Sequence, residues 1–203
     1  MENLKLTRSE KNDLIISESA VFGTGCELTF NETPTKNPSI NNQIKIENGC
    51  RFRNFRIIIR GHNSSVHIGK NTFFTGTIMI EGSNLKVKIG DNCTVNGLFI
   101  TCRDQDILIG NDCLISSDVK IRSSDSHKIF DLDSNILINK PLTPVIIEDH
   151  VWIGQDVFIG KNSLISEGSI VAARTTVTKV INEKNCVIAE YSKIIKRNIR
   201  WEK

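Results

Sequence analysis

A period of six residues constrains the fold of this chain more than any other feature of its sequence. From residue 147 onward, every sixth position is aliphatic without a miss: Ile147, Ile153, Ile159, Ile165, Val171 and Val177. The positions one and four residues later are mostly small or β-branched. This period fits neither an amphipathic helix nor a simple alternating strand. It is typical of a coil of short strands and tight turns, with one inward side chain on each flat face.

The same pattern recurs upstream at wider spacing. An apolar residue begins and a small residue ends the segments 22–26, 46–50, 68–72, 89–93 and 109–113, whose starts lie 24, 22, 21 and 20 residues apart. Three hexapeptides make 18 residues, so we interpret each upstream repeat as one triangular coil with extra residues at a corner. The last residues of these segments are predicted to stack as small buried side chains: Cys26, Cys50, Thr72, Cys93 and Cys113.

The repeat divides the chain into three parts of one all-β domain. We predict a tail with a lead-in strand over 1–21, the coil over 22–182, and a capping segment with a short basic helix over 183–203. All four prolines lie in two stretches without the repeat, 31–39 and about 123–144, because proline cannot donate to a ladder of backbone hydrogen bonds. The second stretch interrupts the tightest part of the coil, and long insertions of this kind are usually functional.

Composition excludes several classes of partner. Hydrophobic residues make up 39% of the 203 residues, and the net charge is +3. A nucleic-acid-binding surface would need a clustered basic face, and a membrane span would need about 18 apolar residues in a row, so we expect neither partner. The first residues carry charges where a secretory signal has its apolar stretch, and the six cysteines form no CxxC pair. These features predict a cytoplasmic protein, and no metal site is expected.

The hexapeptides over 147–181, and more loosely over 22–121, resemble the hexapeptide-repeat acyltransferases, which fold as a left-handed parallel β-helix. Two further segments, Asp125-Ser126-His127 and the His-Val-Trp-Ile-Gly of 150–154, resemble the sugar O-acetyltransferases of bacterial surface polysaccharides, above all those that act on polysialic acid. The left-handed sense is implied by this resemblance alone, since parallel crossovers are ordinarily right-handed. The resemblance also implies acetyl-CoA as donor, a carbohydrate acceptor, and a homotrimer with its sites between neighbouring coils.

Acetyl transfer to a sugar hydroxyl needs a base, because the pKa of an alcohol lies far above 7. Of the four histidines, two fall in upstream coils and His150 in a turn, whereas His127 alone lies in the inserted segment. We therefore predict that His127 is the general base, the alternative being an exposed loop histidine. Either Asp125 or Asp131 is near enough in sequence to orient its imidazole; Asp125 joins the predicted catalytic set.

Trp152 completes that set. It follows an inward position of the repeat and is expected to point outward, where a large ring needs cover. In the enzymes that the chain resembles, a tryptophan at this place lines the catalytic pocket, and its indole N–H can hold the acceptor hydroxyl or the developing oxyanion. The alternative is a ring packed under the inserted segment or at a subunit contact.

The segment 171–179, Val-Ala-Ala-Arg-Thr-Thr-Val-Thr-Lys, resembles the family stretch Val-Gly-Ala-Gly-Ser-Val-Val-Thr-Lys. Ala172 and Arg174 replace glycines there, and Arg174 either adds a phosphate contact or narrows the groove. The basic residues Lys193, Lys196 and Arg197 either reach the coenzyme or form a solvated face. The residues predicted to bind the coenzyme are Gly154, Gly160, Ala172, Ala173, Arg174, Thr178, Lys179 and Lys196.

Three other functions compete with sugar O-acetylation. An N-acetyltransferase of a nucleotide-linked amino sugar would use the same base and groove. A non-catalytic β-helix scaffold would need neither His127 nor the Thr178-Lys179 turn. A covalent cysteine mechanism has little support, because the stacked cysteines point inward and Cys102 has no motif partner. The arginines of one coil either gather an anionic chain or are solvated: Arg51, Arg53, Arg56 and Arg60.

Overall fold

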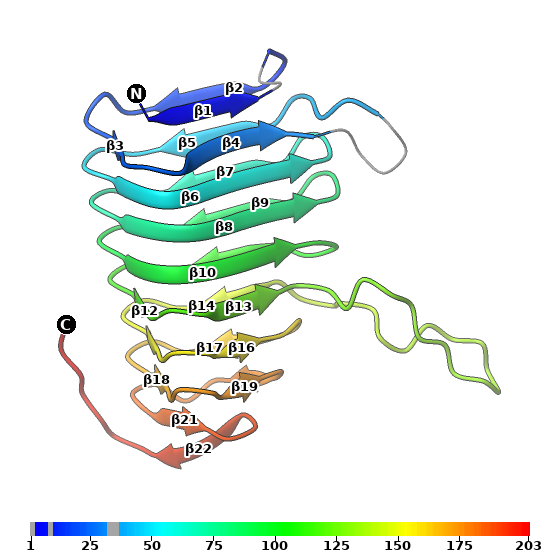
Figure 1. Cartoon of the computed structure of the whole chain (residues 1–203). Coiled ribbons are helices and arrows are strands. Elements are labelled where there is room, and N and C mark those ends of the chain that lie inside the picture. Colours follow the sequence, from blue (N-terminus) through cyan, green and yellow to red (C-terminus); the bar gives the residue numbers. More distant parts are fainter. Residues whose placement is uncertain (1–2, 8–9, 32–36) are drawn as a thin grey trace.

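The computed structural model describes residues 3–7, 10–31 and 37–203, and every regular element in them is a β-strand. The strands form a tall coil with parallel strands stacked rung over rung (Figure 1). Three flat faces follow one another along the chain in each turn of the coil. The described residues contain no helix that could cross a membrane.

The first and second faces belong to one sheet of 14 strands. Three long strands bend from the first face into the second: β6 (Arg51–Arg60), β8 (Phe73–Glu81) and β10 (Thr94–Cys102). The first face otherwise consists of β3 (Val21–Phe22), β12 (Leu114–Ile115), β15 (Trp152–Ile153), β18 (Ile170–Val171) and β21 (Val187–Ala189). The second face otherwise consists of β1 (Leu4–Thr7), β4 (Cys26–Phe30), β13 (Val119–Arg122), β16 (Phe158–Ile159) and β19 (Thr176–Val177).

The third face is a separate sheet of eight parallel strands. Its strands in order are β2 (Asp13–Ile16), β5 (Gln43–Ile46), β7 (Ser65–Ile68), β9 (Lys86–Ile89), β11 (Ile107–Ile109), β14 (Val145–Ile147), β17 (Leu164–Ile165) and β20 (Val180–Ile181). One inward isoleucine per rung aligns through this sheet, as the repeat predicts: Ile46, Ile68, Ile89, Ile109, Ile147, Ile165 and Ile181. These side chains are buried and form the axis of the core.

The predicted stack of small residues is confirmed for four of its five members. Pairing of β6, β8, β10 and β12 in register brings Cys50, Thr72, Cys93 and Cys113 to the same corner of successive coils. Cys26 does not belong to this stack, because it lies beside Phe55 on the second face.

The register of the first coil explains this error. Ile16, thirty residues before Ile46, is the true partner of Ile46. The excursion near residues 31–39 lengthens this coil, so the segment that begins at Phe22 falls on the next face. The coil also begins with β1 and β2, ahead of the predicted start at residue 22. Most of the excursion itself, residues 32–36, lies outside the described residues.

The predicted C-terminal helix is wrong. Residues of 189–201 instead form β22 (Lys193–Lys196), which pairs antiparallel with β21. Because β21 belongs to the last coil, one of its edges would otherwise have unpaired N–H and C=O groups. The chain reverses direction, and β22 pairs with this edge. The chain then runs back along the outside of the coil toward β12, as the red segment in Figure 1 shows.

Candidate active site

The segment between β13 and β14, residues 123–144, projects from the corner of the second and third faces (Figure 1). Its first residues are fixed to the neighbouring coil. The Ser123 hydroxyl donates to the Arg103 carbonyl at 2.8 Å and accepts from the Arg103 N–H at 2.8 Å. The Ser124 hydroxyl donates to the Asp104 carboxylate at 2.6 Å. The inserted segment therefore starts from a rigid stem, three residues before His127.

Beyond His127 the segment folds as a short antiparallel hairpin. Phe130 and Leu137 form a bridge, and the Ile138 N–H donates to the Ile129 carbonyl at 2.9 Å. Asp131 closes the tip, because its carboxylate accepts from the Ser134 N–H at 2.9 Å and from the Ser134 hydroxyl at 2.8 Å. These hydrogen bonds, the backbone one first, lower the pKa of Asp131. Asp131 thus serves the turn, and its carboxylate makes no contact with the His127 imidazole.

Asp125 is held by a lysine from the next coil. Its carboxylate forms an ion pair with Lys161 and accepts from Asn139 Nδ2 at 3.0 Å. The hydrogen bond from Lys161 is the largest of the causes that lower the pKa of Asp125. Asn139 Nδ2 also donates to the His127 carbonyl at 2.8 Å, and Lys161 Nζ donates to the Asn139 carbonyl at 2.7 Å. The network therefore fixes the backbone of His127 and leaves its ring to face outward.

The His127 ring is exposed, and within the described part of the chain it makes no hydrogen bond. It borders a cavity of about 440 Å³ between the inserted segment and the turn at 103–105. Three cationic side chains, Arg103, Lys128 and Lys140, share this lining with one carboxylate, that of Asp104, which accepts from the Ser124 hydroxyl. The arrangement offers a free imidazole nitrogen beside a hollow whose lining carries more positive than negative charge.

Trp152 lies on β15 of the first face, between Leu114 and Ile170 of the adjacent rungs. Its side chain points outward, as predicted, and is 37% exposed. Figure 1 shows the inserted segment leaving the coil on the side opposite β12 and β18, between which β15 is paired. A single chain therefore does not bring His127 and Trp152 together.

The residues predicted to bind the coenzyme separate into two corners. Gly154, Ala172, Ala173 and Arg174 lie where the first face meets the second. A Cβ at Gly154 would lie 2.7 Å from the Ala173 backbone nitrogen, so this glycine is required by the close approach of the coils. Arg174 has a φ of 60°, which explains why glycine is common at this place in the family motif. Its exposed guanidinium lines a second cavity of about 390 Å³ together with Lys120.

The other predicted residues follow the second face. Gly160 lies over Thr178, since a Cβ there would be 3.1 Å from Thr178 Cγ2. The Thr178 hydroxyl donates to Tyr191 Oη at 3.3 Å, and Lys179 is exposed. Lys196 is exposed on β22, in register with Val187. Lys196 is therefore at the end of the first face, apart from the corner with Gly160, Thr178 and Lys179, and one chain does not gather all the predicted coenzyme residues at one place.

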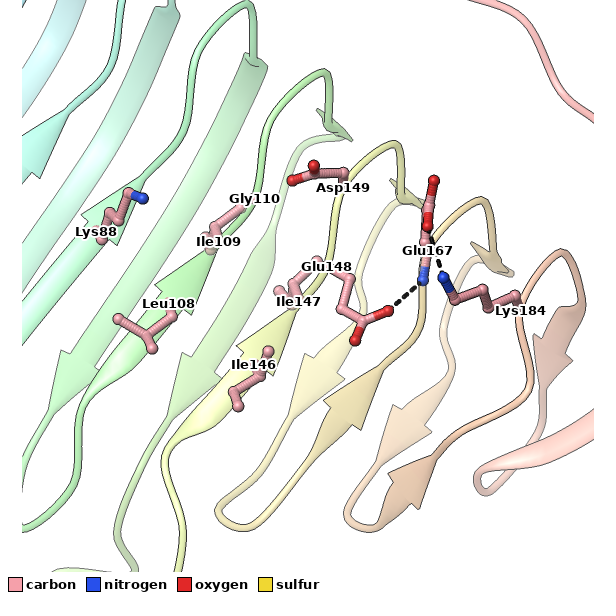
Figure 2. Close-up of a pocket in the computed structure, with 10 residues that line it drawn as sticks. All are labelled: Lys88, Leu108, Ile109, Gly110, Ile146, Ile147, Glu148, Asp149, Glu167 and Lys184. Atoms are coloured by element: carbon pink, nitrogen blue, oxygen red, sulfur yellow. Dashed lines mark hydrogen bonds and ion pairs between the residues drawn. The ribbon is translucent and has the colours of Figure 1, made fainter.

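A third cavity, of about 400 Å³, opens on the third face (Figure 2). The carboxylate of Glu148 accepts from the Glu167 N–H at 2.9 Å, and Lys184 Nζ donates to the Glu167 carboxylate at 2.8 Å. Asp149 also points toward this cavity. Three carboxylates disfavour a phosphate or an acidic sugar here, and none of the predicted site residues lines the cavity.

Sequence reasoning missed three residues that shape this region: Asn139, Lys161 and Trp201. Asn139 and Lys161 act through Asp125, 14 and 36 residues away in sequence. Trp201 packs beside Trp152 from the C-terminal segment. The sequence gives one signal for these three residues, because Trp201 is a large aromatic residue among charged ones. The predicted helix accounts for Trp201 without a contact to Trp152.

All six cysteines are free and buried. Burial raises the pKa of the Cys102 thiol to about 12, and it also raises the pKa of Cys50. A hydrogen bond with Cys113 lowers the pKa of Cys93, but that thiol is buried. Thiols that are protonated or inaccessible are poor nucleophiles near neutral pH. The geometry therefore disfavours a covalent cysteine mechanism.

Comparison with known proteins gives two groups of similar enzymes, while no family model matches. The chain is 36% identical over 137 residues to a polysialic acid O-acetyltransferase of Escherichia coli O1:K1 / APEC, covering 67% of this chain and 44% of that protein. It is 33% identical over 122 residues to a polysialic acid O-acetyltransferase of Neisseria meningitidis, covering 60% of this chain and 56% of that protein. The chain thus spans about half the length of the curated relatives it matches.

Two solved structures are similar over almost the whole chain. The polysialic acid-specific acetyltransferase NeuO is 31% identical, with a TM-score of 0.84, covering 99% of this chain and 88% of that one. The polysialic acid O-acetyltransferase OatWY is 28% identical, with a TM-score of 0.85, covering 99% of this chain and 90% of that one.

Proposed function

The chain belongs to the hexapeptide-repeat acetyltransferases of left-handed β-helix fold that include the polysialic acid O-acetyltransferases, and from this premise we propose that it O-acetylates a bacterial surface polysaccharide. The donor is acetyl-CoA, and the acceptor is a hydroxyl of an acidic, sialic acid-containing capsular glycan. The observation that carries the proposal is the free imidazole of His127 beside a cavity with three cations. A cytoplasmic location is part of the proposal, since six free thiols suit a reducing compartment.

His127 acts as general base in a direct transfer. Its imidazole takes the proton from the acceptor hydroxyl as the oxygen attacks the thioester carbonyl, and the carbon–sulfur bond then breaks. The coenzyme thiolate leaves and receives a proton. This step needs no acyl-enzyme, which agrees with the buried cysteines. Asp125 supports the base indirectly, through Asn139 and the His127 backbone.

The cationic cavity supports an anionic acceptor. Arg103, Lys128 and Lys140 come from both walls of the hollow that His127 borders. A carboxylate on each sugar of the acceptor would be held there beside the base, which would orient a neighbouring hydroxyl. The names of the relatives, polysialic acid O-acetyltransferases, point to the same kind of polymer.

We propose that the working unit is a homotrimer. His127 and Trp152 lie on opposite sides of one coil, and the coenzyme residues divide between two corners. Cyclic symmetry brings different surfaces of identical chains together in closed rings. In such a ring the inserted segment of one copy would meet Trp152 of the next, so each site would be shared.

The function is tested by measuring transfer of labelled acetyl from acetyl-CoA to a panel of acceptors. Polysialic acid is compared with the same polymer after reduction of its carboxylates, with a neutral galactose polymer, and with an amino-sugar nucleotide. His127→Ala serves as the catalytic control. We expect base-labile acetyl esters on polysialic acid and much less label on the reduced polymer. Amide formation on the amino-sugar nucleotide alone, or no transfer to any polymer, would refute the proposal.

A further inference from the structure

The C-terminal segment after β22 runs back beside the coil (Figure 1), and its hydrogen bonds lie along the corner where the third face meets the first. The Ile199 N–H donates to the Asn185 carbonyl at 2.9 Å, and Lys203 Nζ donates to the Asn92 carbonyl. Between them, Trp201 is only 6% exposed although its neighbours Arg200 and Glu202 are exposed. The segment is thus fastened to the coil at its large aromatic residue.

Trp201 is held by His150 through three interactions. The indole and imidazole rings are stacked, with centroids 4.1 Å apart and planes 4° from parallel. The Trp201 indole N–H donates to the His150 carbonyl at 3.0 Å. His150 Nε2 lies 3.1 Å from the Trp201 carbonyl, to which it donates in the Nε2–H tautomer. Each residue therefore binds both the ring and the backbone of the other, which fixes the Trp201 indole in one orientation.

That orientation places the Trp201 ring beside Trp152. The two ring centroids are 6.1 Å apart with planes tilted by 48°, within the range over which aromatic pairs attract each other. The Trp152 side chain is 37% exposed with Trp201 beside it. Trp201 therefore supplies a wall that limits the rotation of the Trp152 indole.

We propose that Trp201 is a positioning residue for acetyl transfer, and that the C-terminal segment 197–203 is a wall of the active site. The inference rests on the proposed function, because it takes Trp152 as the residue that holds the acceptor or the oxyanion. Trp201 orients the Trp152 indole N–H, and His150 holds Trp201. Misplacement of such a group by about 1 Å can cost about 10²-fold in rate.

The test uses the fact that the chain contains only two tryptophans. In Trp201→Ala and in Trp201→Phe, Trp152 is the single source of indole fluorescence. We expect Trp201→Ala to lower kcat about tenfold with acetyl-CoA KM changed less than about twofold, and acrylamide quenching of Trp152 to rise. Trp201→Phe keeps a ring against His150, so it should restore most of kcat and most of the protection.

Two further variants separate positioning from general stability. His150→Asn removes the stacked ring but tolerates the left-handed backbone there, where φ is 54°, so it should reproduce the effect of Trp201→Ala on kcat. Lys184→Ala removes an exposed ion pair with Glu167 on the third face, outside this wall, and should leave kcat unchanged. A Trp201→Ala enzyme with native kcat and with the same Trp152 quenching as Trp201→Phe would overturn the proposal while leaving the function intact. Absence of transfer in the native protein would refute the function, whereas the quenching comparison would still decide the position of Trp152.

Discussion

At the scale of single residues, Asp125 and His127 have separate tasks. The Asp125 carboxylate binds Lys161 and Asn139, and Asn139 holds the backbone of His127. The imidazole remains open to the cavity that carries Arg103, Lys128 and Lys140. This differs from a triad in which the carboxylate binds the ring of the base.

Replacing His127 by alanine should therefore abolish most of the transfer, since a general base contributes about 10²–10⁴-fold in rate. The affinity for acetyl-CoA should stay close to native, because the coenzyme residues lie elsewhere. Steady-state kinetics and calorimetric titration of acetyl-CoA measure the two quantities. Near-native turnover at neutral pH would show that another group is the base, with His150 the next candidate.

The Asp125→Asn variant should lower kcat by about tenfold, less than the loss of the base itself. Hydrogen bonds, chiefly from Lys161, lower the pKa of the Asp125 carboxyl in the folded protein. The ion pair with Lys161 is therefore fully present above the unfolded pKa of about 3.9. It is lost only as the pH falls through the lower pKa of the folded state. Asp125 therefore does not titrate between pH 5 and 8, where histidines do.

In Asp125→Asn, the plot of kcat against pH should therefore keep the midpoint of its acid limb, although kcat at the plateau is lower. Asp131→Asn, at the hairpin tip, is the matched control and should leave both unchanged. A displaced midpoint in Asp125→Asn would show that the carboxylate binds the ring of His127 during the reaction.

At the scale of elements, the hairpin of the inserted segment exposes several apolar side chains. Leu132 is 99% exposed, and Ile136 and Ile138 are each more than half exposed. The polar stem of this hairpin is tied to the coil by hydrogen bonds, whereas the apolar side chains of its outer part remain largely exposed. Such a patch suits a contact with a second copy.

Changing Ile136 and Ile138 to serine should weaken the trimer without unfolding the coil, because neither side chain belongs to the buried core. Analytical ultracentrifugation would show a larger monomer fraction. The thermal unfolding midpoint, measured at a dilution where the native protein also dissociates, should stay near native. The matched control is Val21→Ser, an exposed apolar residue of the first coil. If the double variant were as fully trimeric as the native protein, the hairpin would not be a subunit contact.

The elements also show what the sequence can predict. The isoleucine row of the third face follows directly from the six-residue period, since each rung must present one apolar side chain inward. The period predicts the wrong face for the segment that begins at Phe22, because the excursion after Phe30 lengthens the first coil without leaving a periodic signal. The C-terminal isoleucines suit a helix by spacing, but pairing of β22 with the edge of β21 outweighs that local preference.

The candidate site was predictable only in part. His127 and Trp152 stand out as a histidine in an insertion and an aromatic residue at an outward position of the repeat. Lys161 and Asn139 could not be found, because their roles depend on contacts made across a corner of the coil. Trp201 is equally remote, since it meets His150 from 51 residues away.

At the scale of the whole molecule, the coil separates the two groups that we propose for the reaction. The inserted segment with His127 leaves one side, and the first face with Trp152 and Trp201 lies on the other. We therefore propose that acetyl transfer by this chain requires a neighbouring copy, and that each active site is built from two copies.

Mixing two inactive variants tests this claim most directly. His127→Ala chains keep the Trp152 wall, and Trp152→Ala chains keep the base, so a mixed trimer contains at least one interface with both native residues. After dissociation and joint reassembly, we expect a substantial part of the native transfer rate to return, with a maximum near equal proportions. Each variant reassembled alone should stay inactive. Mixed trimers that are inactive at every ratio, or a fully active native monomer, would contradict it.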